Sequence, residues 1–437
     1  MTQFEGLLLY IDYEKIGERL GFAKGFFYNL KVKQNLDYIE KNQKKILKKL
    51  QHKLPLNVVF YVYDESKWKA QSVYDLMESD ERFNPLVVVT KNCAQEGNAN
   101  YQTEEDIKRC YEFFKKKGMN VEYGYELSPH PCPSPAGRGE DLYIPFEQFK
   151  PDIIIYSHPW YVYKTQGPVV CSKFALTYYI PYFIVIAEKW FEYDLRFHKY
   201  LFKHYVLSEE VKESYGAKMP NKGKNLKAVG HPILDYYYLN DEEKEKKYTI
   251  YAPHWTVCGD NIRFGTFDWS GYKVLEFAKA HPELNWVFRP HPLFYKFVLT
   301  SGYMSKEELD GYYAEWKKVG TISESGDYLG LFKESRALIT DCGSFIMEYF
   351  VSENPMIHLV SEKFEGNSVV QKVDGVNYSA RNKEELFEHL KTVLLDKNDY
   401  KKENRIELLK KLNLKNNFCA ERIINDILKD VGEYSGQ

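Results

Sequence analysis

Short apolar runs alternate with amphipathic stretches along most of this 437-residue chain. The apolar runs predict buried strands at 58–62, 86–89, 153–156, 205–207, 227–229, 248–251, 285–288, 337–340 and 356–360. Apolar residues at helical spacing predict helices at 31–53, 69–77, 103–117, 270–280, 306–318, 383–395 and 400–430. Alternation of this kind predicts α/β structure, in which parallel sheets carry helices on both faces.

The pattern restarts after a charged linker at 240–247, which predicts two domains. Each is expected to be a doubly wound, Rossmann-like sheet, and the two are expected to face each other across a cleft. The predicted division is an aromatic and basic extension at 1–56, a first sheet domain at 57–240, a second at 241–400, and a C-terminal helix at 401–437 that packs back on the first domain. Residues 1–30 carry no interpretable pattern, and the Pro- and Gly-rich stretch 131–139 is expected to be a loop.

Charge and cysteine content exclude several classes of protein. The 60 basic and 62 acidic side chains nearly balance, which argues against a nucleic-acid partner. Seven cysteines without a C-x-x-C pair indicate reduced thiols in a cytoplasmic protein. No apolar run near the start is long enough to be a signal peptide or to cross a bilayer, so any membrane contact is expected to be peripheral.

The lysine-rich helix predicted at 31–53 has two interpretations. It is either an interfacial helix attracted to anionic lipid or a solvated helix packed on a domain. Its apolar stripe is thin and lacks tryptophan, so we favour the packed helix.

The stretch 337–350 combines a buried strand, the turn Asp341-Cys342-Gly343-Ser344 and a helix. Such a helix start presents unpaired backbone N–H groups, which attract anions. Gly343 allows close approach of a ligand, and Ser344 adds a hydroxyl. Glu348 follows one turn later, either as a ribose or phosphate partner or as a solvated helix residue, and we favour the ligand role.

Another strand ends in Arg289-Pro290-His291-Pro292. The prolines fix the backbone, Arg289 suits phosphate, and His291 is placed to transfer a proton or to donate a hydrogen bond to a leaving phosphate. We expect this turn and the turn at 341–344 to meet around a nucleoside diphosphate. The alternative is a rigid turn with a surface histidine.

Three more histidines follow predicted strands. His254, in Ala252-Pro253-His254-Trp255, is expected to contact the second substrate, although an ordinary strand-end turn explains it equally well. Among the five His-Pro pairs we assign ligand contacts to His231 and His158 besides His291, and none to the pairs at 130 and 281. Because no two aspartates stand two apart, we expect neither a metal nor a cofactor.

These motifs together resemble the CDP-glycerol glycerophosphotransferase family, which includes teichoic acid primases, polymerases and capsule enzymes. The resemblance rests on residues 251–255, 289–292 and 340–349, with weaker support at 66–74 and 150–154. It implies a GT-B fold. It also makes Arg289 and His291 diphosphate and catalytic candidates, and it makes Thr340, Gly343 and Ser344 the diphosphate cradle with Glu348 beside it. The family's Trp-His-Gly-Thr-Pro-Leu-Lys motif is missing at 176–183, so His158, His198 and His254 are the candidates for the acceptor-side base.

The resemblance predicts a transferase that moves glycerol phosphate from CDP-glycerol, or another CDP-alditol, to a glycan or lipid-linked acceptor and releases CMP. One alternative is a GT-B glycosyltransferase that uses a nucleotide-sugar. The other is a non-catalytic component of an envelope assembly.

Overall fold

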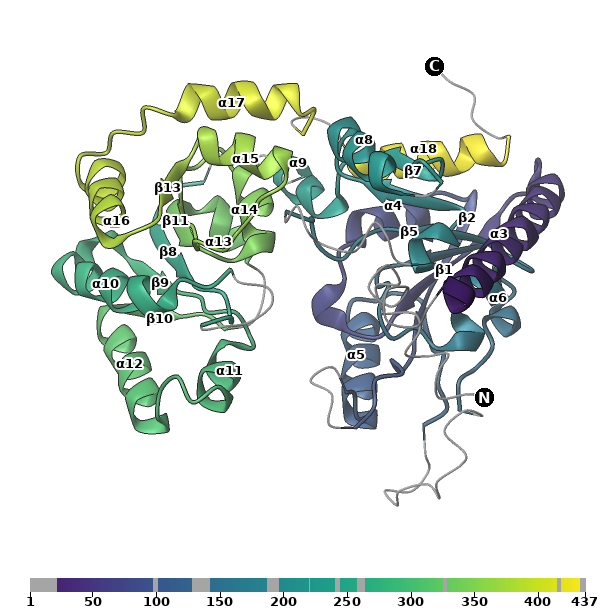
Figure 1. Ribbon diagram of the computed structural model, residues 1–437, viewed down its shortest axis with the longest axis horizontal. Coiled ribbons are helices and arrows are strands. Elements are labelled where there is room, and N and C mark those ends of the chain that lie inside the picture. The colour runs from purple at the N-terminus through teal and green to yellow at the C-terminus, as the bar shows by residue number, and fades with distance from the viewer. Residues whose placement is uncertain are drawn as a thin grey trace. The chain divides into compact units, whose positions relative to one another are not determined.

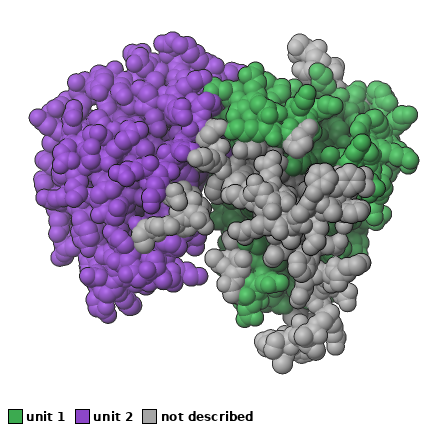
Figure 2. Space-filling model, in the orientation of Figure 1, with its two compact units in different colours: residues 1–183, 191–233, 418–437 green, residues 184–190, 234–417 purple. Residues whose placement is uncertain are grey.

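The computed structural model describes residues 22–96, 101–127, 142–186, 196–219, 221–239, 244–257, 264–324, 328–414 and 418–432. The chain divides into two compact units, which Figure 1 draws as ribbons and Figure 2 colours separately. Unit 1 comprises residues 1–183, 191–233 and 418–437, and unit 2 comprises residues 184–190 and 234–417. Neither unit is therefore one continuous stretch of sequence.

A parallel sheet of seven strands forms the centre of unit 1 within the described residues. Its order is β3-β2-β1-β4-β5-β6-β7, so the chain moves outward from β1 to one edge and then from β4 to the other. The strands are β1 (Leu56–Val62), β2 (Phe83–Val89), β3 (Val121–Tyr123), β4 (Ile153–Tyr156), β5 (Leu176–Tyr179), β6 (Lys203–Val206) and β7 (Leu226–Ala228).

Strand β1 shows why the central strands are apolar throughout. Alternate side chains point to opposite faces of a strand. Val58 and Phe60 enter one hydrophobic cluster, whereas Val59 and Tyr61 enter the other. Both faces of the sheet are therefore buried, which is the arrangement expected of a parallel sheet.

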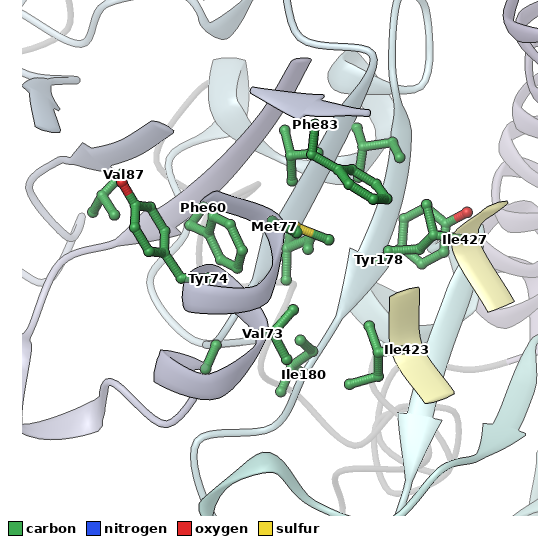
Figure 3. Close-up of a cluster of buried hydrophobic side chains, with 14 of the residues drawn as sticks. Phe60, Val73, Tyr74, Met77, Phe83, Val87, Tyr178, Ile180, Ile423 and Ile427 are labelled. Carbon is green, nitrogen blue, oxygen red and sulfur yellow. The ribbon is translucent and has the colours of Figure 1, made fainter. Parts of the chain in front are cut away.

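The helices of unit 1 cover these two faces. They are α3 (Phe22–Leu50), α4 (Gln71–Ser79), α5 (Glu104–Lys116), α6 (Pro168–Cys171), α7 (Arg196–Lys199), α8 (Glu209–Lys218) and α18 (Cys419–Asp430). Figure 3 shows Met77 of α4 and Ile423 of α18 in the same cluster as Phe60. The basic helix α3 packs Ile46 and Leu50 into this cluster, so its apolar stripe is used inside the protein.

Polar contacts also anchor α18. Lys203 on β6 lies 2.6 Å from Asp426 and also pairs with Asp430. The hydroxyl of Tyr178 donates to Asp430 at 2.9 Å, and the hydroxyl of Tyr205 donates to Asp426 at 3.1 Å. These largely buried charges are paired, so α18 is fixed to the sheet of unit 1.

Unit 2 repeats the topology with six strands in the described residues. The order β10-β9-β8-β11-β12-β13 corresponds strand by strand to the first six strands of unit 1. The strands are β8 (Tyr248–Ala252), β9 (Trp286–Phe288), β10 (Gly320–Ile322), β11 (Ser335–Thr340), β12 (Met356–Leu359) and β13 (Tyr378–Ala380). Thr340 pairs with Ala252, so β8 and β11 end level with each other.

The helices of unit 2 are α9 (Tyr236–Leu239), α10 (Phe267–Ala280), α11 (Phe294–Thr300), α12 (Lys306–Val319), α13 (Leu329–Lys333), α14 (Gly343–Phe350), α15 (Ser368–Gly375), α16 (Lys383–Leu390), a π-helical turn (Lys391–Leu395) and α17 (Lys402–Lys411). Arg405 of α17 is fully buried. Its guanidinium pairs with Asp399 and donates to the carbonyl of Glu353 at 3.2 Å, which fixes α17 to this unit.

The two doubly wound α/β sheets expected from the sequence are confirmed. The prediction of one helix at 400–430 was wrong, because Asn413 takes φ +54° and ends α17 in a left-handed turn before α18 begins. The prediction of a helix at 31–53 was also inaccurate, since α3 begins at Phe22 and ends at Leu50. The loop predicted at 131–139 lies outside the described residues.

Candidate functional site

The candidate site lies at the carboxyl ends of β8, β9 and β11 in unit 2. The chain leaves β8 and β11 in opposite directions along the sheet, and ligands of open α/β sheets bind at such a switch point. His254 follows β8, Arg289 follows β9, and Asp341 follows β11. The register places these three turns at one edge of the sheet.

Asp341 links the turn that follows β11 to the segment that follows β8. Its carboxylate accepts from the backbone N–H of His254 at 2.6 Å, from the N–H of Thr266 at 2.7 Å, and from the Thr266 hydroxyl at 2.9 Å. Burial raises the pKa of the Asp341 carboxyl, and these hydrogen bonds act in the opposite direction. The hydroxyl of Thr340 donates to the carbonyl of Ala252 at 2.6 Å. Thr340 and Asp341 are thus both bonded to protein atoms, and they position the turns.

His254 and His291 lie side by side, with ring centroids 5.4 Å apart. Nδ1 of His254 accepts from the backbone N–H of Thr256 at 3.3 Å and lies 2.8 Å from the Thr256 hydroxyl. Nδ1 of His291 accepts from the N–H of Leu293 at 3.1 Å. Each Nδ1 is therefore an acceptor, and each Nε2 carries the ring proton.

Burial lowers the pKa of both imidazoles. The pKa of His291 falls to about 4, and that of His254 falls well below its ordinary value, with the neighbouring His291 adding to the effect of burial. Both rings are neutral near pH 7. The edge of the sheet therefore offers two adjacent N–H donors, and these suit hydrogen bonding to phosphate oxygens better than removal of a proton.

Arg289 lies in a network that includes Glu348. Its Nη1 donates to the Ser323 hydroxyl at 2.5 Å, and its guanidinium lies 5.3 Å from the ring centre of Tyr328. The Tyr328 hydroxyl donates to Oε2 of Glu348 at 2.5 Å. Glu348 is only 1% exposed, so the alternative of a solvated helix residue was wrong. A buried cation and a buried carboxylate thus contact the same tyrosine.

The start of α14 is partly covered. The side chain of its N-cap residue, Cys342, makes no capping hydrogen bond. A Cβ added at Gly343 would lie 2.8 Å from Cδ1 of Ile186, which occupies the space expected for a ligand. Ile186 is held there because its carbonyl accepts from the N–H of Asn367 at 2.7 Å. Ser344 is half-buried beside this contact.

His158 and His231 belong to unit 1. Nε2 of His231 donates to the carbonyl of Pro181 at 2.8 Å, and Nδ1 accepts from the N–H of Ile233 at 3.4 Å. Burial lowers the pKa of His231 to about 4. Its ring is committed to protein contacts, whereas neither ring nitrogen of His158 has a hydrogen-bond partner among the residues that the structure describes.

Sequence reasoning missed Tyr328, Thr256, Thr266 and Ser323, which hold the charged and titratable groups. Each lies in a loop between elements, and no motif marks it. Within the described ranges no group of three or more His, Cys, Asp or Glu residues is placed to hold a metal ion. Among the same residues, no helix is both long enough and apolar enough to span a membrane.

The fold and the strand-end site define a GT-B-like protein with two Rossmann-like domains. Among solved structures, the chain is similar to UDP-GlcNAc 2-epimerase from Neisseria meningitidis bound to UDP-GlcNAc, with 15% identity over 85% of this chain and 99% of that one, at a TM-score of 0.52. It is also similar to MnaA of S. aureus in complex with UDP, with 11% identity over 87% and 98% of the two chains and a TM-score of 0.56.

A third similar structure is a putative UDP-N-acetylglucosamine 2-epimerase from Listeria monocytogenes, with 13% identity over 88% and 99% of the two chains and a TM-score of 0.56. At these identities the likeness shows the fold. No family model matches the chain. No curated protein matches it either.

These findings correct the functional expectation. The motifs had suggested a CDP-glycerol glycerophosphotransferase with a CDP-alditol donor and a glycan or lipid-linked acceptor. That prediction was wrong, because the similar structures are UDP-GlcNAc 2-epimerases and two of them contain UDP-GlcNAc or UDP. The alternative of a glycosyltransferase is not supported. The wrong choice of substrate has a physical origin, since strand-end turns rich in Gly, Ser, Arg and His can bind the phosphates of any nucleoside diphosphate.

Proposed function

We propose that this chain is a UDP-sugar epimerase and that unit 2 holds the nucleoside diphosphate of its substrate. The observation that carries the proposal is the gathering of Arg289, His254, His291 and the start of α14 at one switch point. The likeness of most of the chain to UDP-GlcNAc 2-epimerases supports the choice of reaction and of uridine nucleotide.

The chemistry of the site fits a diphosphate. A diphosphate carries negative charge on several oxygens, and a guanidinium neutralises it without a metal. The neutral rings of His254 and His291 add N–H donors, and the first turn of α14 adds backbone N–H groups at the positive end of its dipole. Because Ile186 covers Gly343, diphosphate binding requires that this side chain move.

Glu348 is proposed to bind the ribose of the nucleoside. It lies one turn after Ser344 on α14, and its carboxylate is held by Tyr328. A carboxylate in this place accepts hydrogen bonds from ribose hydroxyls, as acidic residues do in dinucleotide-binding folds. The proposed site therefore contains partners for both ends of the nucleoside diphosphate.

Calorimetric titration of the full chain with UDP, CDP and UMP tests the binding site. UDP is expected to bind most tightly. Arg289→Gln is expected to weaken the binding of UDP by at least about tenfold, because a charge-assisted contact to phosphate is lost. Arg381→Gln is the matched control, since Arg381 is an exposed arginine of the same unit. Equal UDP affinity in wild type and Arg289→Gln would exclude the proposed diphosphate site.

Proton NMR of UDP-GlcNAc incubated with the chain in D2O tests the reaction. Inversion at C2 balances when C2 loses its hydrogen as a proton while UDP leaves C1, because the C2–H electron pair then forms a C1–C2 double bond. Return of UDP to C1 and of a solvent proton to the opposite face of C2 completes the inversion. The expected result is therefore a second UDP-sugar whose C2 carries deuterium. Unchanged UDP-GlcNAc under conditions where calorimetry shows it bound would refute the epimerase assignment and leave the binding site in place.

A further inference from the structure

The carboxyl edge of the unit 1 sheet contains a buried histidine that the proposed nucleotide site does not use. His158 follows β4, and Asp64 follows the neighbouring strand β1. Here too the chain leaves the two strands toward opposite edges, so this edge is the switch point of the first sheet. The two turns lie level, because Tyr61 pairs with Tyr156.

The imidazole of His158 contacts two aromatic rings. Its centroid lies 4.0 Å from that of Tyr63 and 5.3 Å from that of Tyr182. Nζ of Lys67 lies 5.2 Å from the Tyr63 ring and 5.5 Å from the Tyr182 ring, and it pairs with Asp64 at 3.2 Å. The site thus combines aromatic faces, an ion pair and a neutral ring.

The two ring nitrogens of His158 have no hydrogen-bond partner among the described residues. The residue is 0% exposed, and within the described residues neither Nδ1 nor Nε2 makes a hydrogen bond. Leaving a buried polar group unsatisfied costs about 1–3 kcal/mol, so such a group in a native fold needs a physical reason. His231 of the same unit shows the contrast, because both of its nitrogens are engaged.

We infer that the switch point of unit 1 is a second ligand site, which binds a vicinal diol of a saccharide through the ring edge of His158. A neutral imidazole has one N–H donor and one acceptor nitrogen, and two adjacent hydroxyls match this pair. The rings of Tyr63 and Tyr182 hold the imidazole, and Asp64 supplies a carboxylate acceptor beside it. The side chains of Lys67 and Asp64 are 23% and 27% exposed, and both nitrogens of His158 are buried. Ligand binding therefore requires that these two side chains move aside.

The ion pair explains why a neutral polyol is preferred to a phosphate. Lys67 is engaged by Asp64, and Asp64 also accepts from the N–H and hydroxyl of Ser66 at 3.0 and 2.7 Å. The nearby carboxylate repels an anion. Burial also keeps His158 uncharged, because its pKa lies well below the ordinary value. The geometry therefore offers hydrogen bonds without net positive charge.

Saturation-transfer NMR titration of the full chain with N-acetylglucosamine, methyl glucoside and inorganic phosphate tests the inference. His158→Phe keeps an aromatic ring in contact with the two tyrosines and removes both nitrogens. We expect saccharide binding in the wild type that weakens at least about tenfold in His158→Phe. The matched control His204→Phe removes another buried imidazole of unit 1, located on β6, and is expected to bind saccharide normally.

A second measurement does not depend on any variant. The ¹⁵N shifts of the His158 ring in the wild type are expected to move when saccharide saturates the protein. Stationary shifts, equal affinity in His158→Phe, or binding of phosphate alone would each overturn the inference. The readout uses free saccharide, so it stands apart from the UDP titration of Arg289→Gln, and either proposal can fail without the other.

Discussion

The buried pair His198 and His204 in unit 1 makes acid stability a quantitative test of the structure. Their rings stack with centroids 4.7 Å apart, and both are at most 1% exposed. Burial lowers the pKa of His204 to about 3, and it lowers that of His198 well below the ordinary value. The perturbation that we propose is His204→Phe, which fits the aromatic surroundings supplied by Tyr179.

The direction in which stability changes with pH follows from the protons that each state binds. Below pH 6.5 the unfolded chain protonates His204, whereas the folded protein does not until pH falls to about 3. The unfolding free energy therefore falls as pH decreases across this window, by about 1.4 kcal/mol per pH unit for one histidine. Integration from pH 7 to pH 5 gives a loss of about 2 kcal/mol that belongs to His204. Below pH 3 no further loss arises from this group.

Urea unfolding at pH 7, 6 and 5 measures the effect. Wild type and His204→Phe are compared at each pH, so that groups common to both cancel. The stability of the variant relative to wild type is expected to rise by about 2 kcal/mol between pH 7 and pH 5. Parallel pH profiles for the two proteins would refute the reasoning, since they would mean that the folded state protonates His204 as readily as the unfolded chain.

Three further outcomes are expected. Arg405→Ala should destabilise the protein by about 3–5 kcal/mol in urea unfolding, because it leaves Asp399 without its buried partner; a loss below about 1 kcal/mol would contradict this. Lys203→Met should lower hydrogen-exchange protection in α18, since Asp426 and Asp430 both lose Lys203 and Asp426 keeps only the longer pair with Lys227 at 3.7 Å. Unchanged protection would count against that anchor. Ile186→Ala should tighten UDP binding severalfold in calorimetry, because a smaller side chain covers Gly343, and weaker binding would argue against that cover.

Much of the fold could be predicted from sequence because the central strands are apolar throughout. Residues 153–156 were placed correctly for this reason, and both faces of β4 are buried. The edge strands β3, β10 and β13 were missed, because each has only three residues and no run long enough to recognise. The separation of α17 from α18 was also missed, since it depends on the left-handed backbone of Asn413.

The candidate site was predictable only in part. Arg289, His254, His291 and Asp341 follow strands, and a parallel sheet brings such turns to one edge. Their roles were harder to foresee. The carboxylate of Asp341 accepts hydrogen bonds from backbone N–H groups. A local hydrogen bond to Nδ1 fixes the tautomer of each of His254 and His291. The cover provided by Ile186 joins residues distant in sequence, which no local pattern encodes.

Comparison of the two sheets shows what distinguishes His158. In each unit one central strand is followed by an aspartate and its neighbour by a histidine. Asp341 and Asp64 both bond to local N–H and hydroxyl groups, so in both units the carboxylate orders the turn. In unit 2, Nδ1 of His254 is satisfied by Thr256, and its ring proton is thereby directed to Nε2. Within the described residues nothing directs the proton of His158. A bound ligand would therefore determine which ring nitrogen of His158 carries the proton. The ¹⁵N shifts of the ring measure this change.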